Sequence, residues 1–151
     1  MMRGVAILQR DLKKFIGHEL DTYDYTIEQS KVNELVAVLN PNLNSAIGSD
    51  HIPATFPTVI EFWGSTSSIA KELQLNLAKV LHGEQEYEYL QGFVVGDKIT
   101  VTSVVENIYE KASMNFIVIN KKFTNQQDEL IAIGKTTIIE RFKKEGRKWR
   151  V

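Results

Sequence analysis

The residues that could carry out acid–base chemistry in this chain are three histidines and two glutamates. The histidines are His18, His51 and His82, and imidazole is the side chain that gains and loses a proton near neutral pH. Glu61 and Glu72 fall in a segment that the sequence predicts to be partly helical. A carboxylate at either position could act as a catalytic base, or it could be a solvated surface side chain.

The histidines allow a functional and a structural interpretation. His82 precedes Gly83 at the start of a predicted strand, where its imidazole could meet a ligand or could be a hydrogen-bonded strand-end residue. His51 lies in an irregular segment, and His18 is expected on the surface. No three His, Asp or Glu residues have metal-ligand spacing, and no phosphate loop, nucleophile elbow or dinucleotide fingerprint is present. The sequence therefore predicts neither a metal nor a cofactor.

A further candidate for ligand binding is the segment Ile52-Pro53-Ala54-Thr55-Phe56-Pro57. Two prolines flank a small residue, a hydroxyl and an aromatic ring, and Pro57 suits the first turn of a helix. The mixed composition of residues 59–77 then predicts helix on either side of an irregular middle. Thr55 and Phe56 either line a pocket or lie in a crossover that the prolines stiffen.

The composition restricts the class of protein. The chain has 151 residues and no cysteine, which predicts one domain over residues 1–151 and excludes disulfides, thiolate zinc sites and a cysteine nucleophile. No apolar run approaches the roughly 18 residues of a membrane span, and the start lacks the apolar core of a signal peptide. The basic tail after Arg141 has no nucleic-acid motif. We therefore expect a soluble cytoplasmic protein that binds neither nucleic acid nor a membrane.

An amphipathic helix is predicted over residues 27–39. Thr26 can cap it, with Gln29 as the reciprocal partner in a capping box. Pro41 closes the run, and the next residues are rich in Asn, Gly and Ser, which predicts an irregular loop. The apolar residues have the three-and-four spacing of one buried face; they are Val32, Leu35, Val36 and Leu39.

The second half of the chain predicts strands. Residues 84–89 alternate between polar and aromatic side chains, and in residues 99–103 Ile99, Val101 and Ser103 alternate with threonines. Residues 114–123 and 130–142 are longer apolar, β-branched runs. Three long strands joined by short connections, including the turn at 124–128, make an antiparallel meander. Helices early and strands late indicate an α+β fold, in which one antiparallel sheet packs a face against a helical layer.

These segments, in this order, resemble the N-terminal half-domain of MaoC-like and fungal-synthase-like dehydratases. The resemblance covers the 25–39 helix, the 53–57 segment and residues 81–141. Its most specific part is Val80-Leu81-His82-Gly83-Glu84-Gln85-Glu86-Tyr87-Glu88-Tyr89, followed by Gly96-Asp97; Gly92 stands where relatives have a proline. The resemblance implies a hot-dog fold, in which a curved antiparallel β-sheet wraps a long central helix.

The resemblance also implies a site from which the catalytic groups are missing. Catalytic relatives carry an Asp, then Asn-Pro, then a His on the loop after the first helix. Laid residue by residue, the Asp falls on Asn40 and the His falls on Ser45. Hydration of an enoyl thioester needs a base and an acid of suitable pKa, and an amide and an unactivated hydroxyl supply neither. The chain resembles a non-catalytic relative of the (R)-specific enoyl-thioester hydratases and dehydratases.

Three functions remain open on this resemblance. In the first, the chain binds an acyl-CoA or acyl-carrier-protein thioester and forms a homodimer, or a heterodimer with a catalytic hot-dog subunit. In the second, it is an active thioesterase using Glu61, or a hydratase using His51 or His82. In the third, it is a structural or regulatory protein that has kept the fold and lost the ligand. The binding residues of the first alternative would be Thr55, Phe56, His82 and Gly83.

Overall fold

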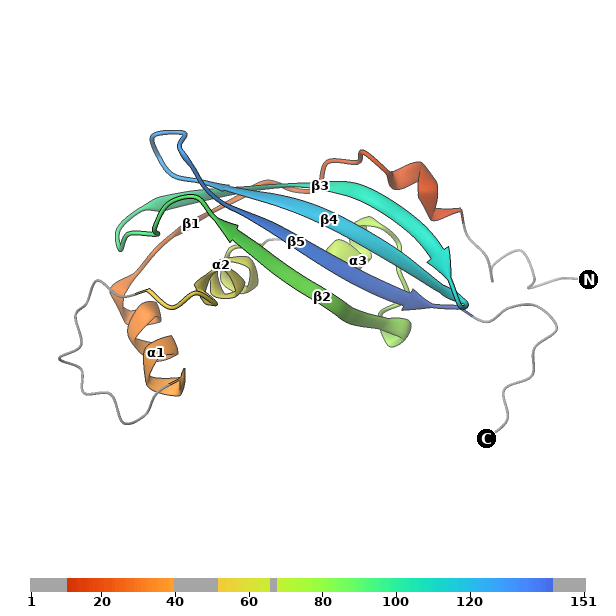
Figure 1. Ribbon diagram of the computed structural model, residues 1–151, viewed down its shortest axis with the longest axis horizontal. Coiled ribbons are helices and arrows are strands. Elements are labelled where there is room, and N and C mark those ends of the chain that lie inside the picture. Colours follow the sequence, from red (N-terminus) through yellow and green to blue (C-terminus); the bar gives the residue numbers. More distant parts are fainter. Residues whose placement is uncertain (1–10, 40–51, 66–67, 143–151) are drawn as a thin grey trace, which may run out of the picture.

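The computed structural model describes residues 11–39, 52–65 and 68–142, and their main element is one curved antiparallel sheet of five strands (Figure 1). The strands lie in the order β1-β3-β4-β5-β2. Their bounds are Tyr23–Thr26 (β1), Val80–Tyr89 (β2), Lys98–Lys111 (β3), Met114–Thr124 (β4) and Leu130–Arg141 (β5). The predicted meander is confirmed in β3, β4 and β5, and β1 and β2 form the two edges.

The concave face of the sheet is covered by two short helices, α2 (Phe56–Gly64) and α3 (Ile69–Glu72), as Figure 1 shows. They stand where the resemblance implies one long helix. The chain leaves helical geometry at Ser65, whose φ and ψ are −67° and 129°. Gly64 packs so closely on β1 that a Cβ there would lie 2.8 Å from Cδ2 of Tyr23. None of the helices in the described ranges is long and apolar enough to cross a membrane.

The predicted start of the first helix is wrong by two residues. Helix α1 spans Gln29–Leu39, because Thr26 is the last residue of β1 and pairs with Lys98 of β3. Thr26, which the capping-box pattern assigns to the start of the helix, is therefore part of the sheet instead. Only the first part of the predicted apolar face is deeply buried, since Val32 is 1% exposed whereas Leu39 is 57% exposed.

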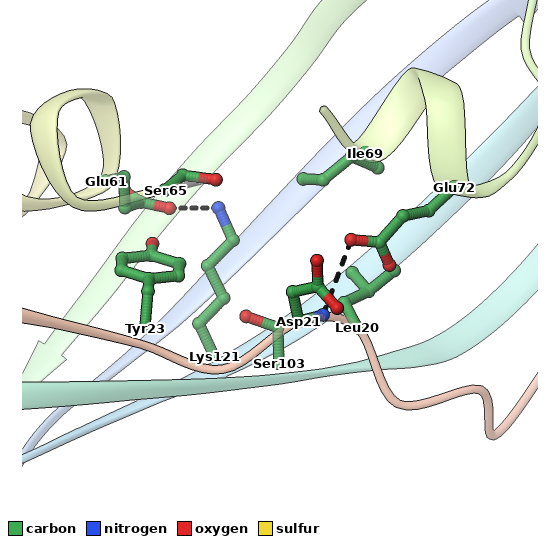
Figure 2. A pocket seen from close by; sticks show the side chains of 9 residues that line it. All are labelled: Leu20, Asp21, Tyr23, Glu61, Ser65, Ile69, Glu72, Ser103 and Lys121. Atoms are coloured by element: carbon green, nitrogen blue, oxygen red, sulfur yellow. Dashed lines mark hydrogen bonds and ion pairs between the residues drawn. The ribbon is translucent and has the colours of Figure 1, made fainter. Parts of the chain in front are cut away.

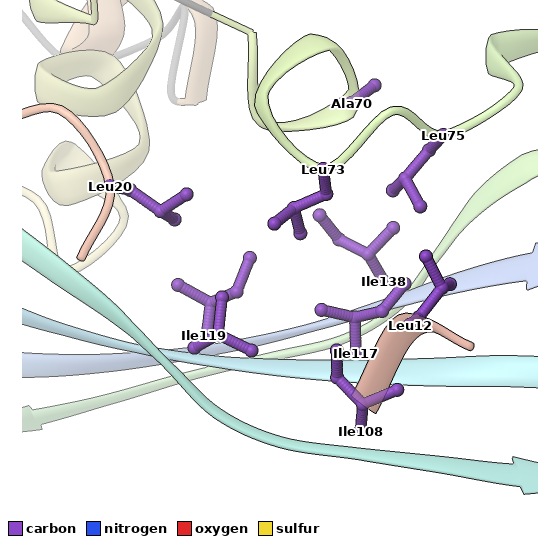
Figure 3. Packing of buried hydrophobic residues seen from close by; sticks show 10 residues of the cluster. Leu12, Leu20, Ala70, Leu73, Leu75, Ile108, Ile117, Ile119 and Ile138 are labelled. Atoms are coloured by element: carbon purple, nitrogen blue, oxygen red, sulfur yellow. The ribbon is translucent and has the colours of Figure 1, made fainter. Parts of the chain in front are cut away.

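Alternate residues of the central strands point to the concave face and form two apolar clusters. The α2 cluster lies under helix α2 and includes Phe56, Ile60, Val101 and Phe123. The α3 cluster lies under helix α3 (Figure 3) and includes Leu20, Leu73, Ile117 and Ile119. Burial of each such side chain stabilises the fold by about 1.5–3 kcal/mol, so these clusters hold both helices against the sheet.

The connections between the central strands are tight, as the sequence predicts. Ala112 and Ser113 join β3 to β4 with φ angles of 54° and 63°, the left-handed geometry of a two-residue hairpin turn. Between β4 and β5, Oδ1 of Asn125 accepts hydrogen bonds from the backbone N–H groups of Gln127 and Glu129, at 2.9 and 3.0 Å. These local bonds fix the register of the strands that carry the site.

Candidate functional site

A row of four residues interrupts the apolar lining of the concave face. The strand register places Ser103 of β3 opposite Lys121 of β4, Lys121 opposite Gly134 of β5, and Gly134 opposite Tyr87 of β2. Directly opposed residues share one face of a sheet, so these four positions, here called the polar row, form a line across the sheet. The line runs between the α2 cluster and the α3 cluster.

Glu61 of α2 meets the polar row from the helical side. Its Oε1 forms an ion pair with the ammonium of Lys121 (Figure 2), and its Oε2 accepts a hydrogen bond from the Tyr87 hydroxyl. The side chains of Lys121 and Glu61 are 8% and 14% exposed, so the ion pair is almost fully removed from water. Both carboxylate oxygens are engaged, and α2 is tied to the centre of the sheet and to its edge.

Gly134 makes room for this arrangement. A Cβ on Gly134 would lie 3.1 Å from Cε1 and 3.2 Å from Cδ1 of Tyr87, and 3.3 Å from Cε1 of Phe123. These distances are tighter than ordinary van der Waals contact, so a side chain here would push the two rings away. The missing side chain therefore lets the Tyr87 ring lie close to Gly134 while its hydroxyl bonds to Glu61.

Two tyrosines, Tyr87 and Tyr23, lie beside the ion pair. Burial, reinforced by the negative charge of Glu61, raises the pKa of Tyr87 far above its ordinary value. The same two causes, in the same order, raise the pKa of Tyr23 on β1. Both phenols therefore stay protonated at any physiological pH, which makes them unsuitable as bases and suitable for stabilising a carboxylate.

A small pocket opens beside the ion pair, between the two helices and the sheet. Its volume is about 70 Å³, far below the roughly 300–1,000 Å³ of ordinary ligand sites. Within it the backbone N–H of Asp21 donates to Oε1 of Glu72 at 3.4 Å (Figure 2). The lining residues are Leu20, Asp21, Tyr23, Glu61, Ser65, Ile69, Glu72, Ser103 and Lys121. The pocket has room for a few water molecules, and both polar and apolar side chains form its walls.

The arrangement around Glu61 is suited to holding elements together. A catalytic carboxylate needs an oxygen that can reach substrate or water. Lys121 and Tyr87 each engage one oxygen of Glu61, and the pocket that Glu61 lines is much smaller than an ordinary ligand site. The described histidines do not supply a base here either. His18 packs edge-on against Phe15, with ring centroids 5.8 Å apart, and His82 is exposed on β2. Neither lines the pocket.

The sequence-predicted site residues are only partly visible. Asn40, Ser45 and His51 lie outside the described residues. Phe56 is fully buried in the α2 cluster, edge-on against Tyr25 at 6.3 Å between ring centroids. Thr55 is exposed just before α2, so these two neighbours face different surroundings.

His82 and Gly83 lie near the start of β2. The register of β2 against β5 shifts between His82 and Glu84, which makes Gly83 the extra residue of a β-bulge. Both residues are exposed. The Tyr89 hydroxyl at the other end of β2 donates to the carbonyl of Ala54, next to Thr55. His82 is therefore separated from the Thr55–Phe56 segment by about 20 Å of strand.

Sequence reasoning missed Lys121, Tyr87 and Gly134. The signal for Lys121 was available, because inward positions of β4 at Ile117, Ile119 and Phe123 are apolar and a lysine interrupts that period of two. Across the described residues no group of three or more His, Cys, Asp or Glu side chains could hold a metal ion.

Comparison with known proteins places this fold. A family model described as the FAS1-like dehydratase domain region matches residues 14–133. The chain belongs to this family. The part that matches the FAS1-like dehydratase region includes Glu61, Tyr87 and Lys121 and ends within β5. A UPF0336 protein of Streptomyces avermitilis is 24% identical over 146 residues, which are 89% of this chain and 97% of that protein.

Solved structures show the hot-dog fold of this FAS1-like dehydratase domain. A MaoC-like dehydratase superposes with a TM-score of 0.67 at 19% identity, covering 87% of this chain and 44% of that one. The chain thus spans less than half of that enzyme's length. The HadBC (3R-hydroxyacyl-ACP dehydratase) complex of Mycobacterium tuberculosis gives 0.59 at 16% identity, over 83% and 96% of the two chains. The ChsH1–ChsH2 complex from the same organism gives 0.60 at 16%, over 90% and 94%.

Proposed function

We propose that this chain is an acyl-thioester-binding hot-dog subunit that lacks its own acid–base pair and works beside a catalytic hot-dog partner. The observation that carries the proposal is the state of Glu61. Lys121 and Tyr87 engage both oxygens of this carboxylate, and the positions aligned with the catalytic Asp and His hold Asn40 and Ser45. On this proposal the fold binds a thioester, and Glu61, Asn40 and Ser45 do not supply the base that would activate water.

The partner role is supported by two observations. Fold relatives include subunits of proteins named as complexes, HadBC and ChsH1–ChsH2. In addition, β2 is an edge strand that pairs with β5 on one side, and an edge strand offers unpaired N–H and C=O groups to another chain. We propose that the catalytic subunit docks along this edge and that the acyl chain lies near Phe56 and the α2 cluster.

The purified chain alone is expected to hydrate crotonyl-CoA no faster than buffer does, because Asn40 and Ser45 cannot activate water. Loss of absorbance by the enoyl thioester measures the rate. Turnover that disappears in His51→Ala or His82→Ala would overturn the proposal and make the chain an enzyme in its own right.

Binding is tested separately from turnover. Isothermal titration with butyryl-CoA and with CoA alone should show binding of the acyl form at least about tenfold tighter, because about 0.8 kcal/mol is gained for each methylene that leaves water. Phe56→Ala should reduce this difference, whereas the exposed Phe62 serves as the matched control, Phe62→Ala. Equal affinities for CoA and butyryl-CoA would contradict the proposed binding of acyl thioesters and would favour a protein that has kept the fold and lost the ligand.

A further inference from the structure

Among the described residues β2 pairs with another strand on one side only, and it carries a run of negative charge. Glu84, Glu86 and Glu88 lie at alternate positions of the strand, and all three are exposed. They are opposed on β5 by Thr137, Lys135 and Ile133. Alternate residues of a strand point to one face, so the three carboxylates stand in one line. That line is on the convex face, since Gln85 and Tyr87 between them share the face of the polar row.

These charges are not neutralised by the neighbouring strand. Lys135 is opposite Glu86, but its ammonium forms an ion pair with Glu106 at 3.3 Å. Among the residues that the structure describes, no ion pair includes Glu84, Glu86 or Glu88. Within the described residues, the edge therefore presents three carboxylates that have no ion-pair partner.

Pairing of β2 with β2 of a second copy would bring these carboxylates together. A two-fold axis that extends the sheet makes the strands antiparallel, and each contact then occurs twice. Opposed residues must share a face, so even-numbered positions from Glu84 to Glu88 meet even-numbered positions. In a register centred on Gln85, Glu84 meets Glu86 of the second copy. In a register centred on Glu86, that residue meets itself and Glu84 meets Glu88.

We infer that the β2 edge is built to pair with a different chain, one that presents Lys or Arg at alternate positions of its own edge strand. Like charges directly opposed weaken strand pairing, and opposite charges strengthen it. The line Glu84, Glu86 and Glu88 thus disfavours the homodimer and favours a heterodimer. The inference rests on the proposed role as a partner subunit and adds the chemistry by which the partner is selected.

The chain itself provides a surrogate for such a basic partner. The triple variant Glu84→Lys, Glu86→Lys, Glu88→Lys should be monomeric at micromolar concentration in low salt, as should the natural chain. An equimolar mixture should form a one-to-one dimer, with affinity at least about tenfold above either self-association, because the opposed glutamate pairs of either register change from like to unlike charge. Sedimentation equilibrium measures this, and 0.5 M NaCl should weaken the mixed dimer.

The control variant carries the same change of charge away from the edge. Glu19, Glu28 and Glu110 are exposed, and their triple change to Lys should give no association with the natural chain. If this mixture associates as tightly as the first, net charge alone explains the association and the inference is overturned. So would a natural chain that dimerises as tightly as the mixture, or a mixture that stays monomeric. No thioester is present, so these results are independent of whether the proposed ligand binds.

Discussion

Lys121→Met is expected to lower the free energy of unfolding by about 3–5 kcal/mol, because it leaves the buried carboxylate of Glu61 without its counter-charge. Urea denaturation with linear extrapolation measures the loss. The matched control is Lys135→Met, which breaks the ion pair with Glu106. In that pair the Lys135 and Glu106 side chains are 43% and 42% exposed. An exposed pair contributes about 0–1 kcal/mol, so the two lysines should differ severalfold.

Removal of both charges should restore most of this stability. In Glu61→Leu with Lys121→Met, the two clusters become continuous across an apolar pair, a replacement that is often neutral for a buried ion pair. The Tyr87 hydroxyl then lacks its acceptor, which costs about 1–3 kcal/mol, so recovery should be incomplete and should improve with Tyr87→Phe. A Lys121→Met variant no less stable than Lys135→Met would show that the ion pair is not buried as described.

The second large effect is a gain of activity. Asn40→Asp with Ser45→His should give weak hydration of crotonyl-CoA, because it restores a carboxylate and an imidazole at the positions aligned with the catalytic pair. A displacement of about 1 Å from the productive geometry lowers the rate roughly 10²-fold, so the restored rate should stay well below that of an evolved enzyme. The rate should titrate with a pKa of about 6.5, the ordinary value of a histidine side chain.

Each single variant serves as the control and should stay inactive. Activity in Ser45→His alone would indicate a base that acts without Asp, whereas an inactive double variant that remains folded and binds butyryl-CoA would show that the residue-by-residue alignment of this loop is wrong.

The sheet could be predicted from the sequence because its signals are local. Alternation and β-branched residues mark β3, β4 and β5, and Asn125 marks a turn. The start of α1 could not be predicted, because Thr26 is suited both to capping a helix and to ending a strand. Its pairing with Lys98 of β3 decides for the strand. Tertiary contacts decide between the two, and the secondary-structure propensity of a residue contains no information about such contacts.

The site was less accessible for a related reason. Glu61 stands out as a carboxylate in an apolar helix, but its partners are 26 residues away at Tyr87 and 60 away at Lys121. Which residues oppose one another depends on strand register and on the bulge at Gly83, and neither follows from composition. Gly134 is recognisable as part of the site only once the Tyr87 ring is seen to lie over it.

Two tyrosine hydroxyls join the outer strand to the helical layer. Tyr87 donates to Glu61 within α2, and Tyr89 donates to the carbonyl of Ala54 just before that helix. A chain that pairs with β2 and stiffens it therefore also stiffens the helix against which an acyl group would rest. On the proposed function the two binding events are thermodynamically linked, and by reciprocity an acyl ligand would strengthen subunit association by the same factor by which the subunit would strengthen acyl binding.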